Sequence, residues 1–576
     1  MNDRTAGDRL LRRAALEGGS WTATLAVVAV LGAIAELLLP ATLGLAVDAA
    51  LGGGAGWWPV VACGLIAAMI VTDIVGGLAV GYSAARATAR LRGTLLRHVL
   101  ALDVRTARRY PVGDLVGRLV SQAADAGQAG NALVFGLVAL LPPLGSVVAL
   151  TLLEPLLGVT LLGGLALMAV LMRAFVTDAS AATADYQRAL GTIAGRLLES
   201  LSGARTIAAA ATVGREEERV LAPLPELTDH GWRSWRLLAR ASARTAAVAP
   251  LLNLAVIAVG GYALTRGWLT TGQLVAALRY AALGAGLGAV VAALNRVVRS
   301  RVGARRLAEL LARPVLADGH RGLPPGRGAL RLQRVTVRGE DGRPVLHGVD
   351  LAVPAGATVA VVGMSGAGKS TLAAVAGRLY DPDEGEVLLD DVPLPQLRQV
   401  ELRRAVGHAF DRPVLVGPTV HDAVGLALPA DAAAPPDDGS TATAPVLRAT
   451  RDATVEECVT RLPEGFRTCL IDAPLSGGEA QRLGLARALT ARRLLILDDA
   501  TSSLDTATEH RVTQAVSGRA GERTRLVVTH RIATAAAADA VAWLDGGQLR
   551  AFAPHLRLWA DPDYRAIFGP SLPGSP

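Results

Sequence analysis

The sequence predicts an α-helical membrane domain with six transmembrane helices, followed by an α/β domain of the P-loop class. Three observations lead to this fold class. Long apolar runs fill residues 1–300, whereas residues 320–576 have the composition of a soluble domain. Arginines gather in only some of the connections between the apolar runs. Residues 363–370 follow the pattern G-x-x-x-x-G-K-S, which is typical of a phosphate-binding loop between a strand and a helix.

The bulk composition is typical of a membrane protein with an attached soluble domain. Hydrophobic residues make up 51% of the 576 residues, aromatic residues make up 4%, and the mean hydropathy is +0.38. This length has room for several domains. We expect a membrane domain at 1–310, a linker at 311–328 and the α/β domain at 329–576. The first apolar run begins near Trp21 and is long enough to cross a bilayer, so we expect no cleavable signal peptide.

The apolar runs give six spans. Their approximate limits are 21–47, 57–84, 131–153, 155–176, 245–266 and 274–297. Arginines fill the N-terminal tail and the connections after the second and fourth spans, while the other three connections are short and nearly uncharged. Cytoplasmic loops carry the excess of basic residues. We therefore expect a multi-pass protein of the cell membrane, with both termini and the α/β domain in the cytoplasm.

The net charge of +8 has two interpretations. It could indicate nucleic acid binding, but arginine-rich cytoplasmic segments beside anionic lipid explain it without such a partner. We expect the lipid bilayer as a partner and no nucleic acid. The three cysteines, Cys63, Cys458 and Cys469, have neither paired metal spacing nor the spacing of a disulfide framework.

Several polar residues fall within the predicted spans, namely Glu36, Asp73, Asn253, Arg279 and Asn295. Ionisable groups at membrane depth are costly and usually face an interior cavity or a partner. Two interpretations stay open for the acidic groups. Glu36 and Asp73 could recognise a cationic or amphipathic substrate in a cavity, or they could form an internal neutralising pair with Arg279.

The P-loop pattern contains Lys369, which is the only lysine in a chain with 58 lysine and arginine residues. Lysine is a compact point charge on a flexible stem, whereas arginine is a planar fork. In this loop, backbone N–H groups surround the phosphates, the lysine reaches the β- and γ-phosphates, and the Ser370 hydroxyl binds Mg²⁺. The apolar run 359–362 predicts a buried strand, and 372–379 predicts a helix whose N-terminus can hold anions.

Four further motifs follow in the α/β half. LSGGE at 475–479 precedes a predicted helix, and the apolar run 494–497 ends in Asp498. SLD at 503–505 and LVVTHR, which contains His530, complete the order. These residues resemble the signature, Walker B, D-loop and switch histidine of ABC ATPases. With six spans before them, the chain resembles an ABC exporter half-transporter along nearly its whole length, and in particular the degenerate-site subunits of actinobacterial heterodimeric exporters.

The resemblance implies ATP and Mg²⁺ as cofactors and a role for each motif residue. The implied nucleotide-binding residues are Gly363, Met364, Ser365, Gly366, Ala367, Gly368, Lys369, Ser370, Thr371, Asp411, Leu475, Ser476, Gly477, Gly478, Glu479 and Asp505. The implied Mg²⁺ ligands are Ser370, Asp498 and Asp411. The implied catalytic residues are Asp499, His530 and Lys369. Catalysis of phosphoryl transfer is mostly positioning and electrostatics.

The resemblance also implies a partner. In the family, the signature faces the nucleotide of the other subunit, so one copy of this domain does not build a complete site. We expect a second half-transporter, which would be a different chain; a slow homodimer, in which two Asp499 sites share the work, stays open as the alternative. Segments 109–119 and 197–218 resemble the far ends of the intracellular loops, whose short coupling helices touch the ATPase domains of ABC exporters.

The chain departs from the family pattern at three positions. Asp499 stands where the family has the glutamate that orients the attacking water. Asp411 stands at the position of the Q-loop glutamine. Around Gly339, where an aromatic residue stacks on adenine, there is no Tyr, Phe or Trp, and Arg338 could stack there or be a solvated turn arginine. The segment before the signature, 468–474, lacks the usual acidic, glycine-rich lead-in.

The function expected from these residues is ATP-driven export by one half of a heterodimer with a weak ATPase site. A peptide, a drug or a lipid could be the substrate. Two alternatives remain open: an ATP-binding regulatory or structural subunit that hardly hydrolyses, and an importer on an exporter-type fold.

Overall fold

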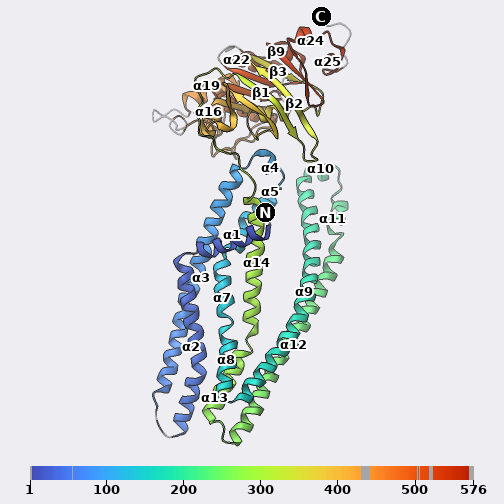
Figure 1. Ribbon diagram of the computed structural model, residues 1–576. Coiled ribbons are helices and arrows are strands. Elements are labelled where there is room, and N and C mark those ends of the chain that lie inside the picture. The colour runs from blue at the N-terminus through green and yellow to red at the C-terminus, as the bar shows by residue number, and fades with distance from the viewer. Residues whose placement is uncertain are drawn as a thin grey trace. The chain divides into compact units, whose positions relative to one another are not determined.

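The computed structural model describes residues 3–52, 54, 56–429, 432, 442–502, 504, 506–517 and 523–569. The chain forms two compact units (Figure 1). The first contains Met1–Leu100 and Pro111–Arg313, and the second contains Ala101–Tyr110 and Pro314–Pro576. The short segment Ala101–Tyr110 therefore packs with the α/β unit, although it lies between two membrane helices in the sequence.

The first unit is helical. Its longer helices are α1 (Asp3–Glu17), α2 (Ser20–Leu51), α3 (Trp58–Ala101), α7 (Ala129–Val138), α8 (Leu141–Leu153), α9 (Pro155–Ser202), α12 (Leu224–Thr265), α13 (Thr271–Gly284) and α14 (Leu287–Leu311). The short helices are α5 (Val112–Gly117), η1 (Arg118–Gln122), α6 (Ala123–Gly127), α10 (Ala204–Ala209) and α11 (Val213–Leu221). The six predicted spans lie in α2, α3, α7–α8, α9, α12 and α13–α14.

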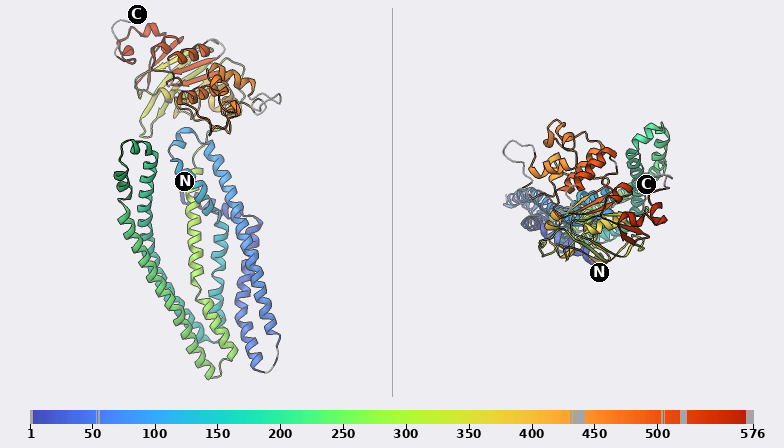
Figure 2. Two further views of the ribbon diagram at one scale, coloured as in Figure 1. Left: turned by 180° about the vertical axis from the view of Figure 1, so that it is seen from behind. Right: turned by 90° about the horizontal axis from the view of Figure 1, so that it is seen from above.

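Length and composition would let four of the described helical stretches cross a membrane. These are Ser20–Leu51, Trp58–Ala101, Val112–Leu153 and Thr271–Leu311. The fourth and fifth predicted spans fall in α9 and α12, whose described apolar parts are shorter, Pro155–Met168 and Pro250–Thr265. Figures 1 and 2 show α9 and α12 side by side over most of their length.

Local contacts fix the packing of α2 against α13. Thr270 begins α13 with a capping box, in which its side chain accepts from the Gln273 N–H. Asp48 accepts hydrogen bonds from the Thr270 hydroxyl at 2.5 Å and from the Gly272 N–H at 2.7 Å. A Cβ at Gly272 would lie 2.0 Å from the Gly44 carbonyl oxygen, so only glycine allows this approach of the two helices.

The second unit contains two sheets and short helices. The strands are β1 (Leu330–Arg338), β2 (Pro344–Val353), β3 (Thr358–Val362), β4 (Glu384–Leu389), β5 (Val392–Pro393), β6 (Val406–Ala409), β7 (Leu494–Asp498), β8 (Thr524–Val528), β9 (Ala540–Asp545) and β10 (Gln548–Ala553). The helices are α4 (Val104–Arg108), α15 (Lys369–Ala376), η2 (Leu394–Gln396), α16 (Gln399–Ala405), α17 (Val420–Gly425), α19 (Ala444–Asp452), α20 (Glu456–Thr460), η3 (Gly465–Arg467), α21 (Gly477–Leu489), α22 (Thr506–Ser517), α23 (Ile532–Ala536), α24 (His555–Leu558) and α25 (Pro562–Ala566).

The six-stranded sheet positions the candidate site. Its strand order is β10-β9-β3-β8-β7-β6, with β9, β3, β8, β7 and β6 parallel and β10 antiparallel. The smaller sheet, β2-β1-β4-β5, is antiparallel. Ligands of open parallel sheets bind outside the carboxyl ends of the strands. The loops after β3, β7 and β8, which carry the predicted motifs, leave this same edge.

Candidate functional site

The P-loop follows β3 and leads directly into α15. Gly368 precedes the helix with a left-handed backbone, at φ 93°. A Cβ at this position would lie 2.9 Å from the Val345 carbonyl oxygen and 2.7 Å from the Leu346 side chain. The close approach of β2 therefore requires glycine here, and the backbone N–H groups at the start of α15 stay free of intrahelical partners.

Lys369 folds back over the loop that contains it. Its ammonium group donates hydrogen bonds to the carbonyl oxygens of Gly363 at 2.8 Å and Met364 at 3.0 Å. Burial lowers the pKa of Lys369, and the nearby negative charges of Asp499 and Asp498 oppose that shift. The one lysine of the chain is thus a partly desolvated cation at the centre of a loop that can bind an anion.

The Ser370 hydroxyl donates a hydrogen bond to the Asp498 carboxylate at 3.0 Å, across the edge of the sheet. Burial raises the pKa of Asp498; the Ser370 hydrogen bond opposes that shift, and the charges of Asp499 and Asp411 add to it. A half-buried carboxylate near other carboxylates is an environment that a divalent cation stabilises. Hydroxyl and carboxylate oxygens are also the ligands that Mg²⁺ prefers, so this donor set fits the predicted cofactor.

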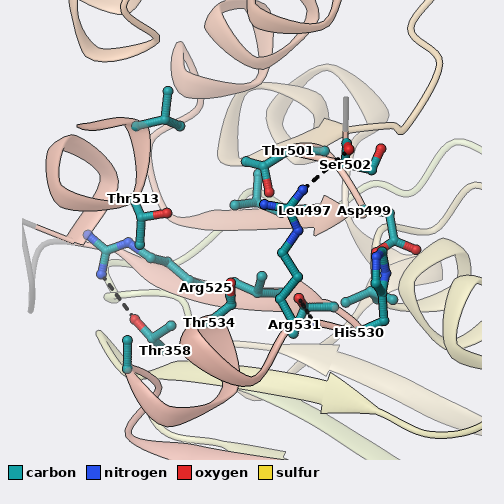
Figure 3. Close-up of a pocket in the computed structure, with 16 residues that line it drawn as sticks. Thr358, Leu497, Asp499, Thr501, Ser502, Thr513, Arg525, His530, Arg531 and Thr534 are labelled. Atoms are coloured by element: carbon teal, nitrogen blue, oxygen red, sulfur yellow. Dashed lines mark hydrogen bonds and ion pairs between the residues drawn. The ribbon is translucent and has the colours of Figure 1, made fainter. Parts of the chain in front are cut away.

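Asp499 and His530 meet at the ends of β7 and β8. The Asp499 carboxylate lies 3.1 Å from the His530 Nδ1 atom, and Figure 3 shows the two side chains beside each other. The backbone of Asp499 is left-handed, with φ 49°, and its N–H donates to the Val528 carbonyl oxygen at 3.3 Å. Aspartate tolerates this conformation better than most residues.

Behind this pair lies a second polar network, which the sequence did not predict (Figure 3). Arg531 donates to the Ser502 carbonyl oxygen at 3.3 Å and forms an ion pair with Glu509. Glu509 also accepts from the Thr501 hydroxyl at 3.0 Å. The loop after β8 is therefore tied to the loop after β7. The one hint of this network in the sequence is that Arg531 directly follows the predicted switch histidine, His530.

Gln481 is the other residue that sequence reasoning missed. Its side-chain amide donates to the carbonyl oxygens of Asp411 at 3.0 Å and Asp499 at 3.4 Å, and to the Ser502 hydroxyl at 3.2 Å. Only 2% of Gln481 is exposed. A glutamine that is buried among aliphatic residues of α21 could have been recognised by its position on the apolar face of the predicted helix.

The signature segment caps α21. The Glu479 carboxylate accepts hydrogen bonds from the Ser476 N–H and hydroxyl, both at 2.8 Å, and these bonds lower the pKa of Glu479. The Glu479 N–H in turn donates to the Ser476 hydroxyl at 3.3 Å. Among the described residues, no hydrogen bond or ion pair joins 475–479 to the P-loop at 363–371.

The remaining predicted residues are placed as follows. The Asp411 side chain is 59% exposed, and its charge acts on Asp498. Arg338 forms an ion pair with Glu384 at 2.7 Å, while its backbone N–H donates to Asp383 at 2.7 Å. Asp505, the predicted D-loop aspartate, lies outside the described residues, as does Ser503.

Residues near the predicted coupling segment 109–119 contact the α/β unit. Arg105, in α4, forms an ion pair with Asp383 at 3.0 Å and donates to the Arg338 carbonyl oxygen. The Val104 N–H donates to the Leu379 carbonyl oxygen at 3.3 Å. The contacting residues therefore begin slightly earlier in the chain than 109–119.

Comparisons with known proteins agree with this architecture. The ABC transporter transmembrane region family matches residues 23–284, and the ABC transporter family matches residues 346–502. The chain is 47% identical over 546 residues to the ABC transporter ATP-binding protein RamA of Streptomyces coelicolor, which covers 94% of this chain and 84% of that protein. It is 33% identical over 399 residues to a multidrug efflux ATP-binding/permease protein of Mycobacterium bovis, over 68% of this chain but only 33% of that protein.

A solved structure has the same fold. A bacterial Atm1-family ABC exporter with ATP bound superposes with a TM-score of 0.78 at 25% identity, covering 94% of this chain and 96% of that one. The predicted fold class, a helical membrane domain with an α/β P-loop domain, is confirmed.

Proposed function

This chain belongs to the ABC transporters, as an exporter-type membrane domain fused to one ATPase domain, and we propose that it is the slow-site half of a heterodimeric exporter. Membership of the family means that the chain binds ATP, couples its hydrolysis to transport and works in a membrane with a partner ABC subunit. The proposal concerns the division of labour between the two chains. It also places both termini and the ATPase domain in the cytoplasm, on the arginine pattern of the sequence.

We assign the roles at this chain's own P-loop as follows. Lys369 and the backbone N–H groups of 363–371 hold the phosphates, with the ammonium group turning from the loop carbonyls to the phosphate oxygens. Ser370 and Asp498 hold Mg²⁺, which neutralises charge on the phosphates when bound. Asp499 positions the water, and His530 contacts the γ-phosphate. The 3.0 Å contact between Ser370 and Asp498 supports the second assignment.

Two observations support the need for a second chain at each site. The signature at 475–479 makes no polar contact with the P-loop among the described residues. In addition, α9 and α12 expose large apolar side chains beyond their apolar stretches, including Leu198 at 67%, Trp232 at 63% and Trp235 at 68%. Exposed apolar surface of this kind usually marks a protein interface, which is consistent with a partner against this helix pair.

The proposed difference between the two ATPase sites rests on Asp499. Its carboxylate is one methylene shorter than glutamate and is held by His530 at 3.1 Å. A well-positioned general base contributes on the order of 10²–10⁴ in rate. A site whose carboxylate is too short to position the attacking water holds ATP and hydrolyses it slowly. The intact signature of this chain then completes the other site, against a partner that supplies the stronger base.

Substitutions in the co-expressed complex test this division. Ser476→Arg should nearly abolish ATP hydrolysis, because it removes the signature from the fast site. Asp499→Asn should leave most of the hydrolysis intact. Asp545→Asn, at the end of β9, is the matched control for loss of one carboxylate. Equal and complete loss from Ser476→Arg and Asp499→Asn, or full activity of this chain purified alone, would contradict the heterodimer. Transport measured in inverted vesicles distinguishes export from import and from a purely regulatory subunit.

A further inference from the structure

The first unit contains a partly open cavity of about 1180 Å³ among the predicted membrane spans. Residues of α2, α3, α7, α8, α13 and α14 line it, and most of them are apolar. Four charged side chains are among the lining residues: Glu36, Asp73, Arg279 and Arg296. This set contains both acidic groups and one arginine that the sequence had singled out within the spans, and it adds a second arginine.

The four charges are divided by sign between two pairs of helices. Glu36 and Asp73 come from α2 and α3, whereas Arg279 and Arg296 come from α13 and α14. Within the described part of the chain, no ion pair within 4.0 Å joins either acid to either arginine. The neutralising pair with Arg279, which was one of the two interpretations of the sequence, is thus not formed in this structure.

Arg296 carries the clearest sign of an unmet interaction. Its guanidinium lies over the Phe135 ring, 5.0 Å from the ring centre, and this face contact neutralises no charge. Its Nε atom is buried and has no hydrogen-bond partner. A buried donor without a partner is costly. Arg296 also lines the cavity, so a ligand with an acceptor group would meet its guanidinium there.

Charged groups at membrane depth need a counter-charge or extensive hydration. Here two acids come from α2 and α3 and two arginines come from α13 and α14, in a lining that is otherwise mostly apolar. A purely cationic ligand would satisfy the acids and oppose the arginines, and a purely anionic ligand would do the reverse. A ligand that carries a positive and a negative charge at opposite ends of an apolar body would neutralise the acids and the arginines at once.

We propose that this cavity binds an amphoteric ligand, with an amine against Glu36 and Asp73 and an anionic group against Arg279 and Arg296. The inference rests on the proposed export function, since it names the chemical class that the exporter would take. Both an exported solute with two charged ends and a zwitterionic lipid headgroup have this chemistry.

Matched probes on the co-expressed complex of this chain with its partner, in nanodiscs of phosphatidylglycerol, test the proposal. The probes are a dansyl-labelled tripeptide with free termini and its N-acetylated, C-amidated and doubly blocked forms. The termini of an extended tripeptide lie roughly 10 Å apart, and the apolar body is the same in all four. The form with free termini should bind at least about tenfold more tightly than either singly blocked form, as expected for one charge-assisted contact.

The variants should remove this preference for one end of the probe at a time. Glu36→Gln with Asp73→Asn should abolish the penalty for N-acetylation and keep the penalty for C-amidation. Arg279→Gln with Arg296→Gln should do the opposite. Glu154→Gln and Arg266→Gln, which change residues outside the cavity lining, are the matched controls and should change neither. Equal binding of all four probes, no binding of any, or loss of both penalties in one variant pair would overturn the proposal.

A second arm distinguishes the two ligand sources. Addition of phosphatidylethanolamine to the nanodiscs should compete with the free-ended probe if the site takes a lipid headgroup, and should leave its affinity unchanged if the site takes a solute. Binding is measured without ATP, so a failure of hydrolysis in the same preparation would count against the proposed function and not against the ligand class.

Discussion

The carboxylate of Asp499 and the imidazole of His530 lie 3.1 Å apart, at the ends of two adjacent parallel strands. This contact joins the loop after β7 to the loop after β8 directly, and the hydrogen bond from Arg531 to the Ser502 carbonyl oxygen joins them a second time. The side chain that would position water and the one that would contact the γ-phosphate therefore restrain each other. Any movement of one loop during turnover has to change this contact.

Replacement of Lys369 tests why this position has the chain's one lysine. Lys369→Ala removes the ammonium group that now bonds to Gly363 and Met364, so ATP binding at this P-loop should weaken roughly 10- to 100-fold, the size of a lost charged hydrogen bond. Lys369→Arg should also weaken binding, because a planar fork does not fit the same position. Titration with a fluorescent ATP analogue measures both. Normal binding by Lys369→Arg would mean that the lysine reflects composition alone.

Gln481 should act as a positioning residue. Gln481→Leu keeps the side-chain volume but leaves the carbonyl oxygens of Asp411 and Asp499 without this donor. Thermal unfolding should report a loss of about 1–3 kcal/mol, the usual cost of an unsatisfied buried group. Single-turnover hydrolysis should fall more than ATP affinity does, because the loop proposed to position the water loses its support. Gln514→Leu, on the exposed face of α22, is the control. A loss of affinity alone would assign Gln481 a purely structural role.

His408 should make the ATPase domain acid-sensitive. Burial lowers the pKa of His408 to about 4, and the charges of Arg403 and Arg487 act in the same direction. The unfolded chain takes up this proton near pH 6.5, whereas the folded chain does not, so the stability is complete above pH 6.5 and is lost as the pH falls towards 4. The loss is on the order of 3 kcal/mol.

His408→Leu should remove this contribution. Unfolding followed at several pH values should show a smaller loss of stability between pH 6.5 and 4 for this variant than for the parent chain. The exposed His320→Leu should behave as the parent does. An unchanged pH dependence in His408→Leu would show that carboxylates alone set the acid sensitivity.

The sequence predicted the parts of the site that short contiguous segments determine. The P-loop, Asp498 and His530 each follow an apolar run, and parallel strands bring the ends of such runs to one edge. The contacts that it did not predict join distant elements: Gln481 reaches Asp411 across 70 positions, and Arg531 reaches back to Glu509. The pairing of Glu36 and Asp73 was also undecided, because the rotation of each span depends on its packing against the others and not on its own hydropathy.

Cysteine labelling tests the orientation of the spans. In a background that lacks Cys63, Cys458 and Cys469, cysteines placed at Gly54 and Arg266 should react with an impermeant reagent on intact cells. Cysteines at Arg108 and Gly214 should react only after permeabilisation. The reason is the excess of arginine in the two long connections. Labelling of the cysteine at Arg108 from outside would overturn the six-span topology.

Lengthening the base at position 499 tests the proposed slow site directly. If the reach of the carboxylate limits hydrolysis, Asp499→Glu should raise single-turnover hydrolysis at this chain's own P-loop by on the order of 10²-fold. The left-handed backbone, at φ 49°, will cost the longer side chain about 1–2 kcal/mol, so thermal unfolding has to be measured beside the rate. Asp499→Asn keeps the size and removes the charge, and it should fall below the parent rate. Because the other site also hydrolyses ATP, each variant is compared in a complex whose other site is silenced by Ser476→Arg. A folded Asp499→Glu complex with an unchanged rate would show that the short base does not make this site slow.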